Sequence, residues 1–372
     1  MPGPENNYYY RVPETKENLD WADLVTLDLS QYEEAEGKKA LVEQLKKAVR
    51  TDGFFSVKNF NISQDEIDQQ YVLAHEFYAM PLEEKLKFYD LGAIEKGEYT
   101  GYEPAGHRIV GNGIRDNIQR YHIPKFDGHH HAQHPSVFAN HIATIEAFSR
   151  KCHTELIEKL LRLFAIFLEL PEDRLVRDHR YDDRGEDQLF YLHYAARTPE
   201  ENEKAGNHYG HGHTDLGTLT LLFPQPVAGL QVQNLEGQWK WVRPEDGKIT
   251  VNAADSLTAL SGGLIRSSIH RVCVPPSDQA HFDRLSLLYF ARPCNHVVLN
   301  PIQDSPLLTR LGLLHNPFTD LGLELKTQDW VKVRQAQQNR RRLEGKLAAD
   351  GTYSCLPSSL EILPGLQAKV YN

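Results

Sequence analysis

The sequence predicts an α+β chain whose core is mainly β, a double-stranded β-helix or jelly roll. Two observations support this fold class. Between residues 189 and 292, seven short segments rich in β-branched and aromatic residues are separated by Gly and Pro. Outside that region, apolar residues recur at helical spacing. Many short strands at close spacing favour two facing sheets, with helices packed around them.

The N-terminal part predicts a small α/β region. Residues 24–29 resemble a short strand, and residues 38–50 carry apolar residues at helical spacing. Residues 54–60 predict a second strand. Ser63 is a good N-cap, with acidic residues in the turn that follows, so a helix should run from there to about Met80. A short helix over 82–88 is expected next.

Residues 91–135 are rich in Gly, Pro and polar groups and predict long loops. Candidates for the mouth of a pocket are Tyr99, Tyr102, Arg108, Arg115 and Arg120, although each alone is more often a surface or packing residue. The histidine-rich run 127–134 is interpreted as an exposed loop, because consecutive histidines cannot all face one ion. From 135 to 170, helical periodicity predicts a long buried backbone helix.

The expected strands are 189–195, 218–223, 229–233, 239–242, 249–252, 267–274 and 285–292. After 298 the pattern becomes helical and loop-like again, with a helix expected over 329–347. We therefore divide the chain into an N-terminal region (1–130), a backbone helix with the catalytic core (131–297) and a C-terminal extension (298–372) whose role the sequence leaves open.

Composition excludes several classes of protein. Of the 372 residues, 40% are hydrophobic and 25% are charged, as in ordinary globular proteins. The formal net charge of −10 disfavours a nucleic-acid partner. No apolar run reaches the roughly 18 residues needed to cross a bilayer, and no secretory signal is recognisable. Four cysteines without metal-binding spacing favour free thiols and a cytoplasmic location. We expect a monomer or a weak homo-oligomer.

A possible metal site begins with His213-Thr-Asp215. On a strand, residues i and i+2 face the same side, about 7 Å apart, so both side chains can reach one ion. His270 lies in a separate expected strand and can supply a third ligand. Two imidazoles and one carboxylate form the facial triad of Fe(II) oxygenases, which leaves positions open for a chelating acid and dioxygen. An H-x-D pair alone is common by chance.

A possible carboxylate site follows fourteen residues after His270. Arg284 and Ser286 stand two apart on an expected strand, and a guanidinium beside a hydroxyl is well suited to bind a carboxylate. Tyr194 lies in the strand that precedes the H-x-D pair, where its phenol can donate to the same carboxylate. Metal ligands together with a carboxylate clamp indicate a 2-oxoglutarate site.

These stretches resemble the isopenicillin N synthase-like branch of the 2-oxoglutarate/Fe(II)-dependent oxygenases. The matching segments follow the family's order over residues 25–297. They are residues 52–60, 213–223, 229–232, 251–255, 260–263, 268–272 and 284–290. The resemblance implies that His213, Asp215 and His270 bind iron. It also implies that Arg284 and Ser286 bind the far carboxylate of 2-oxoglutarate, with the help of Tyr194.

The resemblance further implies the reaction. Fe(II), 2-oxoglutarate and O2 would oxidise a C–H bond of a small molecule, with release of succinate and CO2 and with ascorbate as a stimulant. Hydroxylation, desaturation and ring rearrangement are the expected outcomes, and a specialised metabolite is the expected substrate. Phe190, Phe290 and Arg292 share strand faces with the clamp and are candidate substrate contacts. Polar residues that the family often carries beside Tyr194 are missing, which weakens any transfer of its substrate contacts.

Three alternatives stay open at this point. The first alternative is an oxidase of the same fold that does not use 2-oxoglutarate. Isopenicillin N synthase and aminocyclopropanecarboxylate oxidase are of this kind and retain the Arg-x-Ser pair. A cupin-type metal enzyme is the second, because His211-Gly-His213 superficially fits its ligand pattern. The third is a non-catalytic interaction protein on a degenerate oxygenase fold, which would not bind Fe(II) tightly.

Overall fold

The computed structural model describes residues 12–95, 100–107, 109–111, 114–344, 359–363 and 366–369. Two sheets form its centre, an eight-stranded sheet in the order β1-β2-β11-β8-β13-β7-β6-β3 and a three-stranded sheet in the order β10-β9-β12. Their strands are β1 (Thr26–Asp28), β2 (Phe54–Lys58), β3 (Gly101–Glu103), β6 (Ile118–Pro124), β7 (Gln188–Tyr194), β8 (Leu219–Leu222), β9 (Leu230–Gln233), β10 (Trp239–Trp241), β11 (Lys248–Ala253), β12 (His270–Val272) and β13 (Arg284–Ala291). All seven expected strands between 189 and 292 are present.

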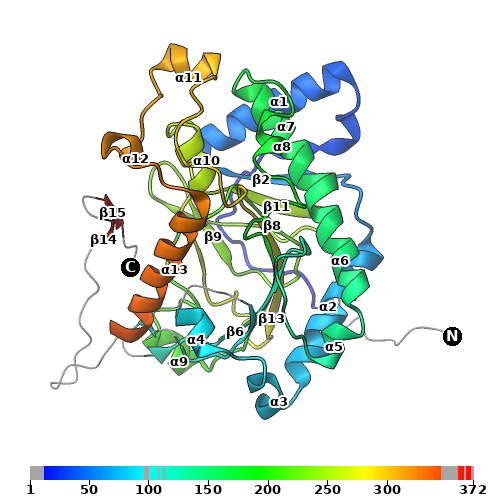
Figure 1. Cartoon of the computed structure of the whole chain (residues 1–372). Coiled ribbons are helices and arrows are strands. Elements are labelled where there is room, and N and C mark those ends of the chain that lie inside the picture. The colour runs from blue at the N-terminus through cyan, green and yellow to red at the C-terminus, as the bar shows by residue number, and fades with distance from the viewer. Residues whose placement is uncertain are drawn as a thin grey trace.

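Helices cover the outer face of the large sheet (Figure 1). They are α1 (Ala35–Thr51), α2 (Gln64–Ala79), α3 (Leu82–Leu86), α5 (Ser136–Ala139), α6 (Ile142–Lys151), the π-helical turn η3 (Cys152–Ile157), α7 (Glu158–Phe167) and α8 (Arg174–Arg177). The expected backbone helix is confirmed as the continuous run from α6 through η3 to α7. Ser63 caps α2 as expected, in a capping box with Glu66.

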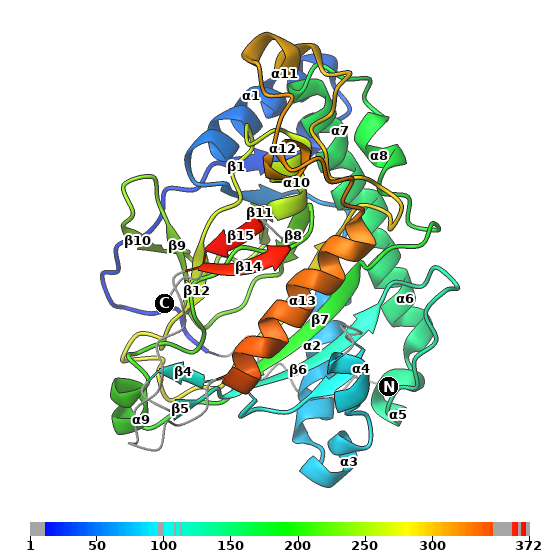
Figure 2. The same cartoon turned by 60° about the vertical axis from the view of Figure 1, so that its left-hand side comes forward.

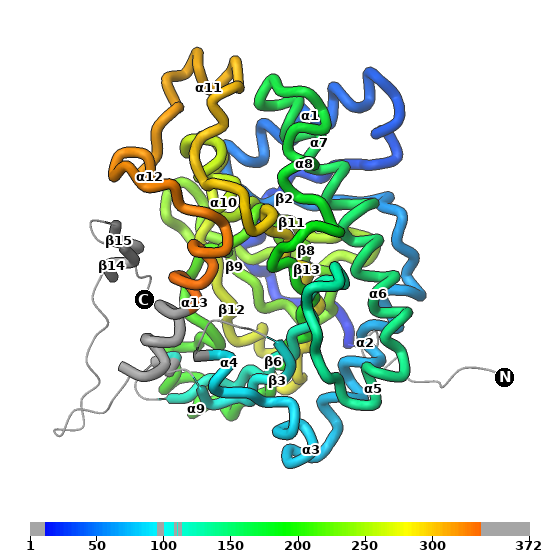
Figure 3. Tube along the Cα trace, viewed as in Figure 1, coloured from blue at the N-terminus to red at the C-terminus, as the bar shows by residue number. Residues whose placement is uncertain are grey.

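The remaining elements lie around the ends of the sheets. They are η2 (Leu29–Gln31), α4 (Leu91–Glu95), β4 (Ile109–Gly111), β5 (Ile114–Arg115), α9 (Pro199–Lys204), α10 (Asp255–Leu260), α11 (Pro306–Leu311), α12 (Pro317–Asp320), α13 (Thr327–Glu344), β14 (Ser359–Leu363) and β15 (Leu366–Lys369). Figure 3 follows the chain from α11 through α12 into α13. This last helix is the one that the sequence predicts near 329.

The expectation that residues 91–135 form loops is wrong for α4, β3, β4 and β5, and most clearly for β6. This strand pairs with β7 over its whole length and is part of the large sheet. Its sequence contains Gln119, Arg120 and His122, so it lacks the apolar alternation by which a half-buried strand is recognised. The polar residues are tolerated because Arg120 and His122 line a pocket rather than the core.

Strand β13 shows how the large sheet separates the core from the pocket. Leu285, Leu287 and Tyr289 belong to the hydrophobic core that the sheet shares with the helices. The alternate residues Arg284 and Ser286 line a pocket between the two sheets. Period-2 alternation thus places every second residue of this strand in the pocket.

Among the residues that the structure describes, no helix is long and apolar enough to cross a membrane.

Two consecutive glycines after α10 provide a test of how tightly the C-terminal extension is packed. Gly262 and Gly263 both have positive φ, +57° and +85°. A Cβ at Gly262 would collide with the carbonyl oxygen of Leu313 in the extension, whereas a Cβ at Gly263 would meet nothing within 4 Å. Left-handed backbone costs a non-glycine residue about 1–2 kcal/mol, so both sites share this cost but only Gly262 adds a collision.

We expect Gly262→Ala to lower the free energy of unfolding by roughly 1–3 kcal/mol more than Gly263→Ala, because overpacking costs that much. Urea denaturation followed by circular dichroism measures both variants. Equal losses would show that the Leu313 segment moves aside without cost.

Candidate metal and 2-oxoglutarate site

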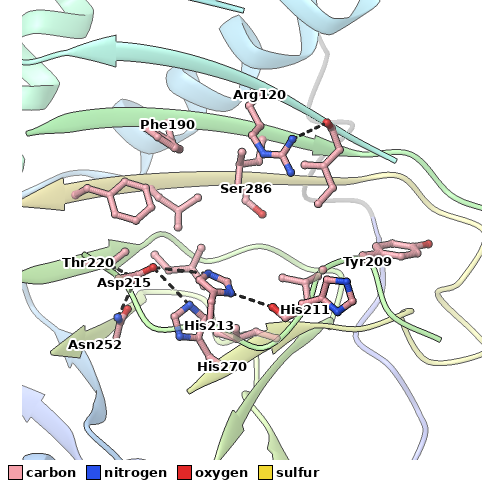
Figure 4. Close-up of a pocket in the computed structure, with 18 of the residues that line it drawn as sticks. Arg120, Phe190, Tyr209, His211, His213, Asp215, Thr220, Asn252, His270 and Ser286 are labelled. Atoms are coloured by element: carbon pink, nitrogen blue, oxygen red, sulfur yellow. Dashed lines mark hydrogen bonds and ion pairs between the residues drawn. The ribbon is translucent and has the colours of Figure 1, made fainter. Parts of the chain in front are cut away.

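The structure brings His213, Asp215 and His270 together, as the sequence predicts (Figure 4). One ligand atom from each lies within 4.8 Å of the others. The Oδ1 atom of Asp215 is 3.7 Å from Nε2 of each histidine. Among the described residues this is the only such group of His, Cys, Asp or Glu side chains. The donor set that suits Fe(II) consists of two imidazole nitrogens and one carboxylate oxygen that face a common position.

The two histidines are joined through their backbones. Each donates its N–H to the carbonyl of the other, with both N–O distances 3.0 Å, in an isolated antiparallel bridge. Asp215 lies between this bridge and β8, on neither strand. The expectation that His213 and Asp215 share one strand is therefore wrong in detail. Instead, the bridge and the turn after it direct both side chains towards the same metal-binding position.

Hydrogen bonds orient each histidine ring and place a proton on its Nδ1 atom. Nδ1 of His213 lies 3.1 Å from the carbonyl oxygen of His211, and Nδ1 of His270 lies 3.2 Å from that of Ser268. Because a carbonyl only accepts, Nδ1 must carry the proton in both rings. This leaves Nε2 of each ring directed at Asp215, where it can bind a metal ion.

The buried carboxylate of Asp215 is held by one of its oxygens. Oδ2 accepts hydrogen bonds from the Thr220 hydroxyl at 2.7 Å and from the Asn252 amide at 2.9 Å. Burial raises the pKa of Asp215, but the charges of His270 and His213 and these two hydrogen bonds outweigh it, so the pKa lies below its usual value. The carboxylate is therefore ionised, and Oδ1 is directed at the histidines.

Arg284 and Ser286 lie in the same pocket on neighbouring inward positions of β13. Nη1 of Arg284 donates to Oγ of Ser286 at 2.8 Å, and that hydroxyl donates to Oε1 of Gln225 at 3.0 Å. Nε of Arg284 donates to the Val227 carbonyl at 3.3 Å. Arg284 is only 2% exposed. Among the described residues, no carboxylate lies within ion-pairing distance of it, so the pocket holds a buried cation that lacks a counter-ion.

Tyr194 stands opposite Arg284 on β7, and its ring centre is 5.0 Å from the guanidinium carbon. Its ring also stacks on Tyr209, at 6.2 Å between centroids. Tyr209 lines the pocket, and its buried hydroxyl has no hydrogen-bond partner among the described residues. Tyr209 is not among the site residues that the sequence predicts, although it lies four residues before His213. Its position in that run is the only signal that pointed to it.

The three candidate substrate residues also line the pocket, which has a volume of about 300 Å³. Phe190 on β7 meets Phe290 on β13 edge to face, at 4.6 Å between ring centroids. Arg292 follows β13 and is buried, and its backbone N–H donates to Asp187 at 2.7 Å. This part of the pocket wall therefore combines two aromatic rings with a guanidinium.

Arg120 on β6 is a further cation in the pocket wall (Figure 4). It is buried and forms ion pairs with Glu103 at 3.1 Å and Asp116 at 3.0 Å. Two carboxylates therefore balance its charge, in contrast to Arg284. In the histidine-rich loop His130 pairs with Asp127, and among the described residues no three metal-binding groups converge there.

The hydrogen bond from Thr220 to Asp215 can be tested directly. Thr220→Val keeps the shape of the side chain and removes the hydroxyl, and partners of metal ligands typically contribute 10–100-fold to metal affinity. We expect anaerobic Fe(II) titration to show an affinity lowered about tenfold or more. Thr250→Val on β11 is the matched control and should bind Fe(II) like the wild type. Wild-type affinity in Thr220→Val would mean that Asn252 alone orients the carboxylate.

Comparison with known proteins agrees with this site. Residues 24–141 match the family described as non-haem dioxygenase in morphine synthesis N-terminal, and residues 186–293 match the 2OG-Fe(II) oxygenase superfamily. Flavanone 3-dioxygenase 2 of Oryza sativa subsp. japonica is 32% identical over 321 residues, which are 83% of this chain and 86% of that protein. The 2-oxoglutarate-dependent dioxygenase gloE of Glarea lozoyensis is 31% identical over 76% of this chain and 83% of its own length.

Among solved structures, a full-length Neurospora crassa protein in complex with alpha-KG and thymine superposes with a TM-score of 0.74. The match covers 85% of this chain and 97% of that one, and at 23% identity it shows the fold alone. The predicted double-stranded β-helix is thus confirmed. With an intact His213-Asp215-His270 triad and both family domains present, the chain belongs to the 2OG-Fe(II) oxygenase superfamily and is a 2-oxoglutarate/Fe(II)-dependent dioxygenase.

Proposed function

We propose that this enzyme oxidises a C–H bond of a small, ring-containing specialised metabolite held between Phe190, Phe290 and Arg292. Hydroxylation, desaturation and ring rearrangement are the outcomes open to such a substrate, with succinate and CO2 as co-products. The proposal places 2-oxoglutarate on Arg284 and Ser286. It places the enzyme in the cytosol, which suits the free thiols of the described cysteines.

The observation that carries the proposal is the buried Arg284, which no carboxylate of the described residues neutralises. Desolvating a guanidinium is costly unless an anion compensates it, and Ser286 and the Val227 carbonyl supply only neutral contacts. The far carboxylate of 2-oxoglutarate can supply the missing charge, since a guanidinium and a hydroxyl bind a carboxylate together. The same pocket contains the metal triad, so one small dianion can reach both ends.

Tyr194 assists this binding in the proposal. Its ring lies against the guanidinium of Arg284, where the aromatic face stabilises the cation and restricts its position. The planar fork of Arg284 then presents a fixed edge to the carboxylate. Tyr209 stacks on Tyr194 and brings a second phenol to the same end of the pocket.

The chemistry is divided between cofactor and protein. Bound iron supplies the site at which dioxygen and 2-oxoglutarate react. His213, Asp215 and His270 occupy one face of that site and leave the other face open. The aromatic wall formed by Phe190 and Phe290 excludes water and orients the substrate ring. Because a carboxylate occupies the third ligand position, no position is left for a halide, and halogenation is disfavoured.

The aromatic pocket and the similarity to flavanone 3-dioxygenase 2 and to gloE both support a small-molecule substrate. A flat ring fits beside the edge-to-face pair of Phe190 and Phe290, because aromatic contacts stabilise it there. Arg292 at the end of β13 would then favour a substrate with an electronegative oxygen at that side. Ascorbate would act by keeping the iron reduced.

We expect the anaerobic protein to develop a weak visible charge-transfer band only when both Fe(II) and 2-oxoglutarate are present. His213→Ala should lose the band, because the keto acid chelates a metal that the variant no longer holds. Arg284→Ala should still form it but require roughly 100-fold more 2-oxoglutarate, the loss expected for a buried charge-assisted contact of about 3 kcal/mol.

Arg310→Ala is the matched control, since Arg310 is an exposed arginine that pairs with Glu169 and should leave the titration unchanged. A band that forms in Arg284→Ala at the wild-type concentration of 2-oxoglutarate would contradict the assignment of the clamp. Succinate release that depends on an added ring compound would identify a substrate.

A further inference from the structure

Helix α13 of the C-terminal extension passes over strands whose residues line the pocket. Figure 2 shows it crossing in front of β7 and β6. One of its residues, Gln335, lines the same pocket as the metal triad and the pocket faces of β6, β7 and β13. The C-terminal extension therefore contributes to the wall of the active site, opposite the strands of the large sheet.

Helix α13 is fixed to the segment that carries the metal ligands. The indole of Trp330 donates to the carbonyl of Leu216 at 3.2 Å. One turn later, Arg334 reaches Oδ2 of Asp255 at 3.4 Å, and the same oxygen accepts from the Thr214 hydroxyl at 3.1 Å. Thr214 and Leu216 flank Asp215, so the helix is held on both sides of that ligand.

Gln335 is placed differently from its anchored neighbours. Its side chain is 5% exposed, and its Oε1 has no hydrogen-bond partner among the residues that the structure describes. Buried polar atoms without a partner are rare in native proteins because each has lost its hydrogen bonds to water. A buried amide retained at the wall of a binding pocket indicates that its partner arrives with a ligand.

We propose that Gln335 is a specificity-determining residue that accepts a hydrogen bond from an O–H or N–H group of the substrate. This rests on the proposed function, because it requires the substrate to lie in the triad pocket. The substrate class becomes a compact ring compound with a hydroxyl, amine or imide donor on the side that faces α13. An analogue without the donor leaves Oε1 buried and unpaired, so the site rejects it.

A matched pair of probes tests the acceptor. 2-Naphthol is an aromatic ring with one O–H donor, and 2-methoxynaphthalene is the same ring without it. Both are titrated calorimetrically into the anaerobic enzyme loaded with Fe(II) and 2-oxoglutarate, where no turnover occurs. The wild type should bind 2-naphthol about tenfold more tightly than the ether, the effect of one hydrogen bond to a buried acceptor.

In Gln335→Leu, which keeps the approximate volume and removes the acceptor, this preference should fall to about twofold or less. Gln328→Leu is the matched control, because Gln328 lies on the same helix but does not line the pocket, and its preference should equal that of the wild type. The melting temperature of ligand-free Gln335→Leu should be unchanged or higher, since a buried atom without a partner is removed.

Three results overturn the proposal. One is a wild type that binds neither probe or does not distinguish them, and another is a preference that survives in Gln335→Leu. The third is a melting temperature several degrees lower in Gln335→Leu, which would show that the amide has a partner within the fold. The charge-transfer band recorded in each sample separates these failures from failure of the proposed function, which would abolish the band in the wild type.

Discussion

The site depends on the paired backbone hydrogen bonds between His213 and His270. His270 begins β12 in the small sheet, and His213 precedes β8 in the large one. The bridge therefore joins the segment that leads into the large sheet to the first residue of β12 in the small sheet. Each histidine then uses a carbonyl two residues earlier to orient its ring. Three ligand atoms converge without any strand carrying more than one of them.

Electrostatics divides the pocket into two ends with opposite requirements. At the triad, Asp215 is ionised and buried, and hydrogen bonds to one oxygen leave the other for a cation. At the proposed clamp, Arg284 is buried, and no carboxylate of the described residues forms an ion pair with it. Arg120, in the same wall, is neutralised by two carboxylates and contributes no net attraction. A metal ion would compensate the charge of Asp215 at one end, and a carboxylate would compensate that of Arg284 at the other. A single 2-oxoglutarate that binds the metal can supply this carboxylate.

Much of this was predictable from sequence, for identifiable reasons. His213, Asp215 and Arg284 stand at spacings that require few assumptions about the fold, and β7–β13 are recognisable by their β-branched and aromatic residues. Strand β6 was missed because its inward residues face a pocket and are polar, so the usual apolar period is absent. Tyr209 and Gln335 were missed because their significance is a buried hydroxyl or amide without a partner, a property of three-dimensional surroundings that no local pattern contains.

The anchoring of α13 explains why a residue so far along the chain can determine where the substrate reacts. A hydrogen bond fixes the orientation of a substrate only if its acceptor is stationary relative to the metal. Trp330 and Arg334 connect the helix to the residues on either side of Asp215, partly through Asp255, whose backbone N–H also donates to the Asp215 carbonyl at 2.9 Å. Gln335 directly follows Arg334 on this helix, and so it moves with the metal ligands rather than with the rest of the extension. Small displacements of reacting atoms strongly change reaction rates, and this linkage holds the acceptor, the substrate ring and the iron in a fixed arrangement.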